Sequence, residues 1–425
     1  MLLNKPRACE LLDREGAAAL LAHTPINQYY LSDYWGFFNY PTGYEGAYLS
    51  LFTRHAQAPS ALIVPALELR RLETKGTDRP ATWMPNIFAY SSPADEQQLL
   101  PDHTPKGQDY AGWLPGSGEL QPLEKRWVQA VQRKGHDMSP DAFWALARAI
   151  KAADLHGQRV IVDDLRIDLW LRSIGVEDLD CVYNPQLFNE IRMLKTADEI
   201  EIMRKAARIN EQALIAAANA FYASASWQEL QAVYMTEMAQ QGGRGVYLMC
   251  GLGELPARKV RRNEPIMLDA LGQYQHYHGD FGRCAVFGEP TAKHQRLHAG
   301  LCLGWEVAQS LLRPGIRYSE LAQQIGDAVR AGGFEHFRDP IVHGLGLEHT
   351  DDPKPFGVQP QTKLDQTLQP NMVINIDMPH TEIGWGSVHV EDTVRITESG
   401  FELLSASDLS ILTVESSQTH GGPAH

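Results

Sequence analysis

The sequence predicts an α/β (α+β) protein of two domains, and three features of its 425 residues support this. The chain is longer than the roughly 250–300 residues at which a single hydrophobic core stops growing. In its first part, short β-rich runs alternate with helical segments. In its second part, amphipathic helices come before apolar runs that end in acidic residues, a pattern typical of helices and strands packed together.

The first domain is expected over residues 1–188. Short β-rich runs bounded by Pro, Gly or Ser lie at residues 27–30, 47–53 and 61–64. Ser139 can cap a helix whose apolar residues recur at helical spacing. The segment from Arg159 to Asp163 then predicts a buried strand, so strand, helix and strand follow in succession and make this domain α/β.

An aromatic-rich segment runs from Tyr34 to Tyr44 within this domain. Its Gly and Pro residues favour a loop, and so many rings on one loop are seldom left in water. The rings therefore either form local core or cover a pocket.

The second domain is expected over residues 189–412, with residues 413–425 as a disordered tail. Thr196 and Glu199 have the spacing of a capping box, so a long amphipathic helix should begin there. Further helices are expected over residues 227–240 and within 294–331, and the remainder favours strands and turns.

Composition excludes several classes of function. A net charge of −14 argues against nucleic acid or an anionic membrane as partner, and no apolar run reaches the length of a membrane span. The acidity either keeps the protein soluble or reflects a site that attracts cations. The five scattered cysteines suit a reducing compartment, and the N-terminal residues do not resemble a secretory signal, so a cytoplasmic protein is expected.

Two acidic residues point to a possible metal site. Asp269 ends an apolar run, and Asp280 follows eleven residues later. A short hairpin would bring the two carboxylates side by side, where they repel unless a cation lies between them. The alternative is that Asp269 only ends a strand and Asp280 caps a turn.

Three later residues extend this pattern. His343 lies in a stretch rich in glycine, which lets an imidazole approach a metal closely, although a lone buried His is often only a core residue. Asp377 ends another apolar run, and Glu391 lies inside a strand, where an unpaired carboxylate costs several kcal/mol. One buried acid suggests a salt bridge, but four acids and a His suggest a divalent metal.

The order of these motifs resembles the pita-bread metallopeptidases, which include methionine aminopeptidase, aminopeptidase P and prolidase, together with their metal-free relative creatinase. The resemblance rests on Asp269 and Asp280, the run His343–Gly346, Asp377 at the end of a strand, and the run Glu391–Thr393. The segments Thr24–Ser32 and Arg192–Ile200 also resemble parts of prolidase-like chains. The resemblance implies an N-terminal creatinase-like α/β domain and a C-terminal pita-bread catalytic domain.

The resemblance also implies a dinuclear metal centre, with Asp280 and Glu391 bridging two divalent ions. The implied ligands are Asp269, Asp280, His343, Asp377 and Glu391. A hydroxide held between the ions would attack the scissile carbonyl, and the ligand types suit manganese, or Zn, Co or Fe. A homodimer is implied as well, in which the N-terminal domain of one subunit can help close the site of the other. The density of rings on the aromatic segment makes it our candidate for that role, with Trp35, Phe37 and Tyr44 as candidate substrate contacts.

Several positions depart from the family pattern. Asp377 replaces the usual Glu, Thr350 replaces a second His, and His389 replaces an Arg. The usual Asp-x-Thr-Arg-Thr becomes Asp280–Cys284, and the upstream pocket His has no counterpart in residues 246–253. The candidate catalytic residues are therefore His349, Asp351 and His389, and Arg283 is a further candidate substrate contact.

The resulting hypothesis is a metal-dependent hydrolase of a C–N bond, acting on an Xaa-Pro dipeptide. A creatinase-like, ectoine-hydrolase-like or lyase-type enzyme that acts on a small non-peptide molecule is the alternative. A binding module without catalysis is a third possibility. Neither a Gly-x-Ser-x-Gly elbow nor a phosphate-binding Gly-x-x-x-x-Gly-Lys-Ser/Thr loop is present.

Overall fold

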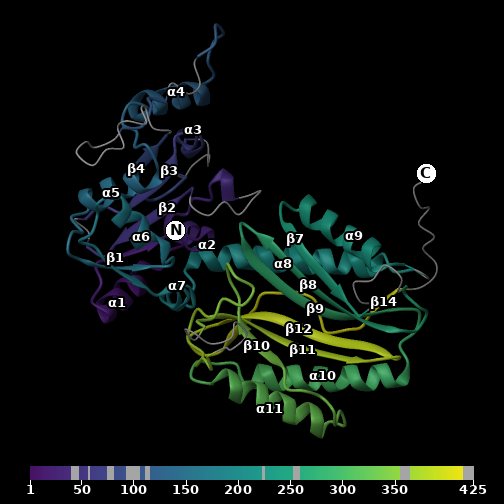
Figure 1. Cartoon of the computed structure of the whole chain (residues 1–425). Coiled ribbons are helices and arrows are strands. Elements are labelled where there is room, and N and C mark those ends of the chain that lie inside the picture. Colours follow the sequence, from purple (N-terminus) through teal and green to yellow (C-terminus); the bar gives the residue numbers. More distant parts are fainter. Residues whose placement is uncertain are drawn as a thin grey trace. The chain divides into compact units, whose positions relative to one another are not determined.

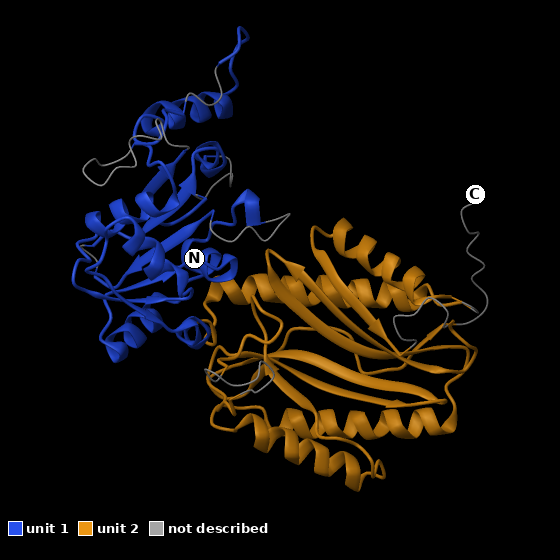
Figure 2. Cartoon of the chain, in the orientation of Figure 1, with its two compact units in different colours: residues 1–191 blue, residues 192–425 orange. Residues whose placement is uncertain are grey.

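The chain forms two compact units, unit 1 (Met1–Ile191) and unit 2 (Arg192–His425), which divide close to the predicted boundary at residue 188 (Figure 2). The computed structural model describes residues 1–39, 47–55, 58–73, 81–91, 106–110, 115–222, 225–251, 259–354 and 364–414. No helix within these ranges is both long enough and apolar enough to span a bilayer.

Unit 1 contains, among its described residues, a six-stranded mixed sheet with the order β4-β3-β2-β1-β5-β6 (Figure 1). The strands are β1 (Ala19–Ala22), β2 (Leu49–Thr53), β3 (Ala61–Pro65), β4 (Asn86–Tyr90), β5 (Arg159–Val162) and β6 (Asp180–Tyr183). The helices are α1 (Lys5–Glu15), α2 (Pro25–Ser32), η1 (Phe37–Asn39), α3 (Glu68–Leu72), α4 (Pro122–Lys134), α5 (Ala142–Ala152), α6 (Arg166–Ser173) and α7 (Pro185–Arg192).

The predicted strands at β2, β3 and β5 are confirmed, whereas the predicted strand at residues 27–30 is wrong. That segment lies in α2, which begins at Pro25, a residue suited to the first turn of a helix. Its buried Gln28 donates hydrogen bonds to Ser32 and Ser50, so tertiary contacts override the β propensity of the neighbouring tyrosines. In α5 the cap is Asp141, not Ser139.

Unit 2 contains, in its described part, an eight-stranded sheet. Six strands follow the order β10-β11-β12-β9-β8-β7, and the other two, β13 and β14, pair with β12 and β9. The strands are β7 (Arg244–Cys250), β8 (Pro265–Tyr274), β9 (Tyr277–Phe287), β10 (Ile341–Gly344), β11 (Val373–Glu382), β12 (Gly386–Ile396), β13 (Phe401–Leu403) and β14 (Leu412–Val414). The helices are α8 (Ala197–Asn219), α9 (Trp227–Gln240), α10 (Ala292–Leu311) and α11 (Tyr318–Ala331).

Two helix pairs cover two halves of this sheet (Figure 1). Helices α8 and α9 pack on β7, β8 and β9, and helices α10 and α11 pack on β11 and β12. Because side chains alternate along a strand, the residues that face the helices are apolar, such as Leu268 and Ile376. The residues between them, including Asp269 and Asp377, point to the opposite face.

The capping box at the start of α8 is confirmed, since Thr196 and Glu199 exchange the two expected hydrogen bonds. The expected tail is partly wrong, because Thr413 and Val414 belong to β14, which runs parallel to β9. Residues 415–425 lie outside the described residues.

Asp351, predicted as a catalytic residue, instead belongs to a buried ion-pair network beside α8. Its Oδ1 accepts hydrogen bonds of 2.9 and 2.6 Å from Arg192, and its Oδ2 accepts one of 3.3 Å from Lys195. Burial by itself would raise the pKa of Asp351, but the two cations hold it below its ordinary value of 3.8. The carboxylate is 1% exposed and is held by both cations, so we expect a structural role for it.

We expect Asp351→Ala to lower the free energy of unfolding by about 3–5 kcal/mol, because it leaves two buried cations without this partner. Because the pKa of Asp351 is lowered in the folded state, this stabilisation is present at neutral pH and is lost as the pH falls through that lowered pKa. Denaturant unfolding at pH 7 measures the change. Asp327→Ala, which breaks an exposed pair with Arg330, is the control and should cost less than about 1 kcal/mol. Wild-type stability with lost turnover would return Asp351 to the catalytic residues.

Candidate metal centre

The β8–β9 hairpin brings the first two predicted ligands together, as their spacing predicted. Its turn, at Gln275 and His276, has positive φ at both residues, which suits a tight two-residue connection. Asp269 pairs with Gly282, and Asp280 pairs with Leu271. Both carboxylates therefore project from the same face of the hairpin, away from the helices.

The other three predicted ligands lie on the strands that follow across the sheet. Glu391 of β12 pairs with Gly282 of β9 and, on its other side, with Asp377 of β11. His343 of β10 pairs with Asn375, which lies two residues before Asp377 and so shares its face. Five neighbouring strands thus contribute one predicted ligand each to one face of the sheet.

The donor atoms of these residues fall into three overlapping groups within the described part of the chain. In each group the donor atoms lie within 4.8 Å of one another. The groups are Asp280, His343 and His349; Asp377, His389 and Glu391; and Asp269, Asp280 and Glu391. The side chains of Asp280 and Glu391 are 1% and 3% exposed, so this is a buried cluster of like charges.

Three carboxylate oxygens of this cluster lack the partners that buried polar atoms normally have. Asp269 Oδ1, Asp280 Oδ1 and Glu391 Oε2 are buried and make no hydrogen bond to any described residue. Burial raises the pKa of Asp269 to about 7, and the charge of Asp280 acts in the same direction. Burial and the Asp280 charge also hold the pKa of Glu391 well above its ordinary value. Such a donor set fits divalent cations, which supply the missing positive charge.

His389, predicted as a catalytic residue, lies inside this cluster. Its imidazole is fully buried, with Nε2 2.6 Å from Asp377 Oδ1 and 3.6 Å from Glu391 Oε2. Its Nδ1 lies 3.3 Å from the carbonyl oxygen of Leu268. Burial opposes charge on this ring, but the neighbouring Asp377 raises the pKa of His389 overall.

His349 lies at the edge of the cluster, where the sequence placed a substitute for the missing family His. Its side chain is 44% exposed, and its Nε2 is 3.1 Å from Asp280 Oδ2. Its ring centroid is 4.9 Å from that of His343. A partly exposed imidazole beside buried carboxylates can reach both the cluster and a bound molecule.

Tyr247 of β7 was missed as a candidate by the sequence reasoning. Its ring meets His349 edge-to-face, with centroids 6.5 Å apart. Burial, followed by the charges of Asp269 and Asp280, raises the pKa of its hydroxyl, which therefore stays protonated. The signal was present, because Tyr247 lies in the segment where the family pocket His is absent.

Arg283, predicted as a substrate contact, is corrected by the structure. Its side chain is fully buried and pairs with Asp392 at 3.0 Å. It also donates a hydrogen bond of 2.9 Å to the carbonyl oxygen of Glu391. The guanidinium therefore supports the strand that carries Glu391 and is not open to a substrate.

The described aromatic side chains of unit 1 pack locally. Trp35 meets Tyr29 edge-to-face at a centroid distance of 5.6 Å, and the Arg71 guanidinium lies 4.2 Å from the ring of Phe37. Phe37 is 43% exposed. Tyr44 lies outside the described residues. The contact of Trp35 and Phe37 with a substrate remains a prediction.

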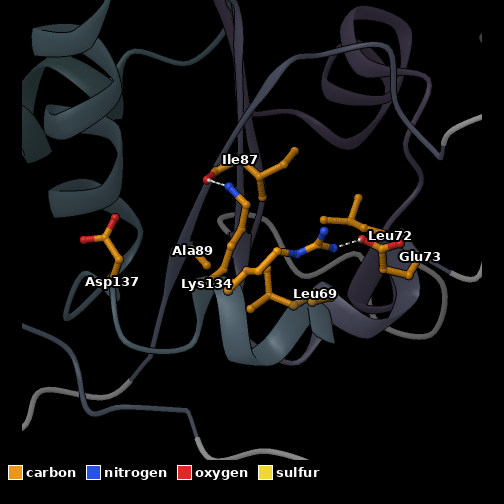
Figure 3. A pocket seen from close by; sticks show the side chains of 9 residues that line it. Leu69, Leu72, Glu73, Ile87, Ala89, Lys134 and Asp137 are labelled. Carbon is orange, nitrogen blue, oxygen red and sulfur yellow. Dashed lines mark hydrogen bonds and ion pairs between the residues drawn. The ribbon is translucent and has the colours of Figure 1, made fainter. Parts of the chain in front are cut away.

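A separate pocket of about 410 Å³ lies in unit 1 between α3, β4 and α4 (Figure 3). Its two cations already have partners: Arg133 pairs with Glu73 at 3.3 Å, and Lys134 donates a hydrogen bond to the carbonyl oxygen of Ile87. The charged groups of this pocket therefore differ from the acidic cluster, where buried carboxylate oxygens lack hydrogen-bond partners among the described residues.

Comparison with known proteins agrees with this geometry. Residues 201–398 match the model of metallopeptidase family M24. Two similar curated relatives are Xaa-Pro dipeptidases of Pyrococcus furiosus and Pyrococcus horikoshii, each 26% identical over 238 residues. Each alignment covers 53% of this chain, and they span 67% and 66% of those relatives, or about two-thirds of their length.

Solved structures extend the similarity over nearly the whole chain. The prolidase from Pyrococcus horikoshii OT3 has a TM-score of 0.64 at 19% identity and covers 96% of this chain and 99% of its own. The Xaa-Pro dipeptidase from Bacillus anthracis has a TM-score of 0.68 at 17% identity, with the same two coverages. At such identities the likeness establishes the fold. Residues 201–398 of the chain therefore match metallopeptidase family M24, and the chain has the pita-bread fold of the prolidases; together these findings support a metallohydrolase of the Xaa-Pro peptidase and creatinase type.

Proposed function

We propose that the chain hydrolyses the C–N bond of an Xaa-Pro dipeptide and depends on two divalent metal ions. The proposed ligands are Asp269, Asp280, His343, Asp377 and Glu391. The observation that carries the proposal is the set of buried carboxylate oxygens without hydrogen-bond partners among the described residues. The similarity to an Xaa-Pro dipeptidase and to a prolidase supports the substrate class.

Metal ions bound by these residues would act as Lewis acids and lower the pKa of a bound water at neutral pH. Carboxylates with imidazole suit manganese, zinc, cobalt or iron. Around the ions, the side chains of Asn375 and Thr393 hold the backbone of Asp280, because both donate to its carbonyl oxygen, at 3.4 and 2.9 Å. The ligand strand is thereby fixed before any substrate binds.

Two residues at the edge of the centre have the chemistry to act on a substrate. His349 is partly exposed, and its ring can take up or release a proton while Asp280 orients it. The protonated hydroxyl of Tyr247 can donate a hydrogen bond to a substrate oxygen. We propose these two groups as the functional replacements for the family's pocket histidines.

A second candidate function is hydrolysis of a small non-peptide amide or amidine, or lyase chemistry on a small molecule. It is favoured by two departures from the family pattern, Thr350 and the absence of a His in residues 246–253, because the groups that would contact a peptide are changed there. The same metal centre would serve both reactions, so only turnover of defined substrates separates them.

We expect the purified wild-type protein to bind about two transition-metal ions per chain in elemental analysis. His343→Ala should lower the affinity for metal by more than the roughly 10–100-fold that loss of an outer-shell residue costs. His380→Ala is the matched control, because His380 lies on β11 but packs against Phe334 on the helix side of the sheet. Its metal content should equal that of wild type. Absence of metal from the wild-type protein under every loading condition would contradict the proposed function.

Metal-loaded wild-type protein should hydrolyse Xaa-Pro dipeptides, and His349→Gln should lower kcat by about 10²–10⁴-fold, because it removes a proton-transfer group. Its metal content should stay at two ions. Small amides assayed in parallel test the second candidate function. Turnover of His349→Gln equal to that of wild type would exclude His349 as the proton carrier.

We also propose a homodimer in which Trp35 and Phe37 contact the substrate. Sedimentation measures the assembly, and Trp35→Ala and Phe37→Ala should each raise KM by up to about tenfold through loss of an aromatic contact. Variants that melt early but keep native kinetics would show instead that these rings only stabilise unit 1.

A further inference from the structure

Three of the positions at which this chain departs from the family pattern meet at one point of the sheet. Gly282 stands where the pattern has Thr, Asp377 where it has Glu, and His389 where it has Arg. In the structure, Gly282 pairs with Asp269 and with Glu391, whose other neighbour is Asp377. The three changes are therefore parts of one local rearrangement beside the acidic cluster.

The glycine makes room for the imidazole. A Cβ atom at position 282 would lie 2.2 Å from Cε1 of His389 and 2.4 Å from its Nδ1. Both distances are far below van der Waals contact, and both atoms belong to a ring that is fully buried. Any side chain at this position, including the usual Thr, excludes the observed placement of His389.

The orientation of the imidazole aims one nitrogen at the carboxylates. In the neutral tautomer that donates from Nδ1 to the Leu268 carbonyl oxygen, 3.3 Å away, the ring proton lies on Nδ1. The lone pair of Nε2 then faces Asp377 Oδ1 at 2.6 Å and Glu391 Oε2 at 3.6 Å. A lone pair directed at two carboxylates is repelled, so either a proton on Nε2 or a metal cation has to lie among the three groups.

The shorter carboxylate explains why an extra donor is useful here. Asp377 reaches one methylene less far than Glu, so an ion held by Asp377 and Glu391 has weaker support from β11. The imidazole enters from β12 on the same face, two residues before Glu391, and its donor atom lies within 4.8 Å of both carboxylate oxygens.

We propose that His389 is a metal ligand of this chain, which binds through Nε2 the ion shared with Asp377 and Glu391. This inference rests on the proposed metal-dependent function and adds a sixth ligand to it. An added imidazole also changes the metal preference: nitrogen ligands suit zinc, iron and cobalt better than manganese, which prefers oxygen. The site near His389 should therefore prefer zinc or cobalt over manganese.

The test separates the two ring nitrogens. His389→Asn keeps a donor near the position of Nδ1 and removes the atom at Nε2, whereas His389→Gln keeps an acceptor near Nε2. Metal stoichiometry and affinity are measured by calorimetric titration of the metal-free protein with Zn²⁺, Co²⁺ and Mn²⁺. The visible absorption of the Co²⁺ form reports the ligands independently of activity.

We expect wild type to bind two ions and His389→Asn to weaken one of them by at least about tenfold, with a change in the Co²⁺ spectrum. His389→Gln should recover part of the affinity. Gly282→Ala should weaken the same ion, because the added Cβ would lie 2.2 Å from the imidazole and 2.6 Å from Glu391 Oε2 and would displace both groups while the residues themselves are retained. The loss should be larger for Zn²⁺ than for Mn²⁺.

The control is His380→Asn, a change on the helix side of the same sheet that should leave both ions and the Co²⁺ spectrum unchanged. Melting curves verify that each variant is folded. If both His389→Asn and Gly282→Ala bind two ions with unchanged affinity, the inference is overturned. His389 would then be a protonated hydrogen-bond partner of Asp377, and the proposed function would still stand. Wild type that binds one ion would also overturn the inference. Failure of wild type to bind any metal would contradict the proposed function itself.

Discussion

Mutual repulsion among buried carboxylates is the constraint on which the rest of unit 2 depends. Donor oxygens of Asp269, Asp280 and Glu391 lie within 4.8 Å of one another. At an effective dielectric constant of 20, each ionised pair at that separation repels by at least about 3 kcal/mol. The sheet holds these groups together because helices packed on its other face fix the strands, and the repulsion is relieved by protonation of the acids or by a bound cation.

The strands are held in place because side chains alternate between the two faces of the sheet, and the apolar face packs against helices. The apolar residues between the acids pack against two helix pairs, so a shift of one residue in register would move the acids into the core and expose the apolar set. Buried charges behind and beside the site are paired instead: Asp392 with Arg283, and Asp351 with Arg192. The acids of these two pairs have a cation as partner, whereas the acidic cluster keeps three buried carboxylate oxygens without a hydrogen-bond partner among the described residues.

This distinction also explains what could be predicted from the sequence. Local spacing predicted the hairpin that joins Asp269 and Asp280, and apolar runs predicted the strands that carry Asp377 and Glu391. The partners of Asp351 and Arg283 could not be predicted, because Arg192 and Asp392 lie more than 100 residues away along the chain. Both residues therefore looked available for chemistry. Helix α2 was missed for a related reason, since contacts of its buried polar side chains decided its conformation.

The changed positions around the centre alter its charge while the fold is retained. In the proposed centre, four ligand carboxylates would balance two divalent ions, and a neutral imidazole at His389 would add a donor atom without adding charge. The Arg usual at that position would add one positive charge that a substrate carboxylate or a reaction intermediate could use. Without that positive charge, the centre attracts a negatively charged substrate group less strongly. The choice between an Xaa-Pro dipeptide and a small uncharged amide therefore depends on the residues that depart from the family pattern, and the shared fold does not decide it.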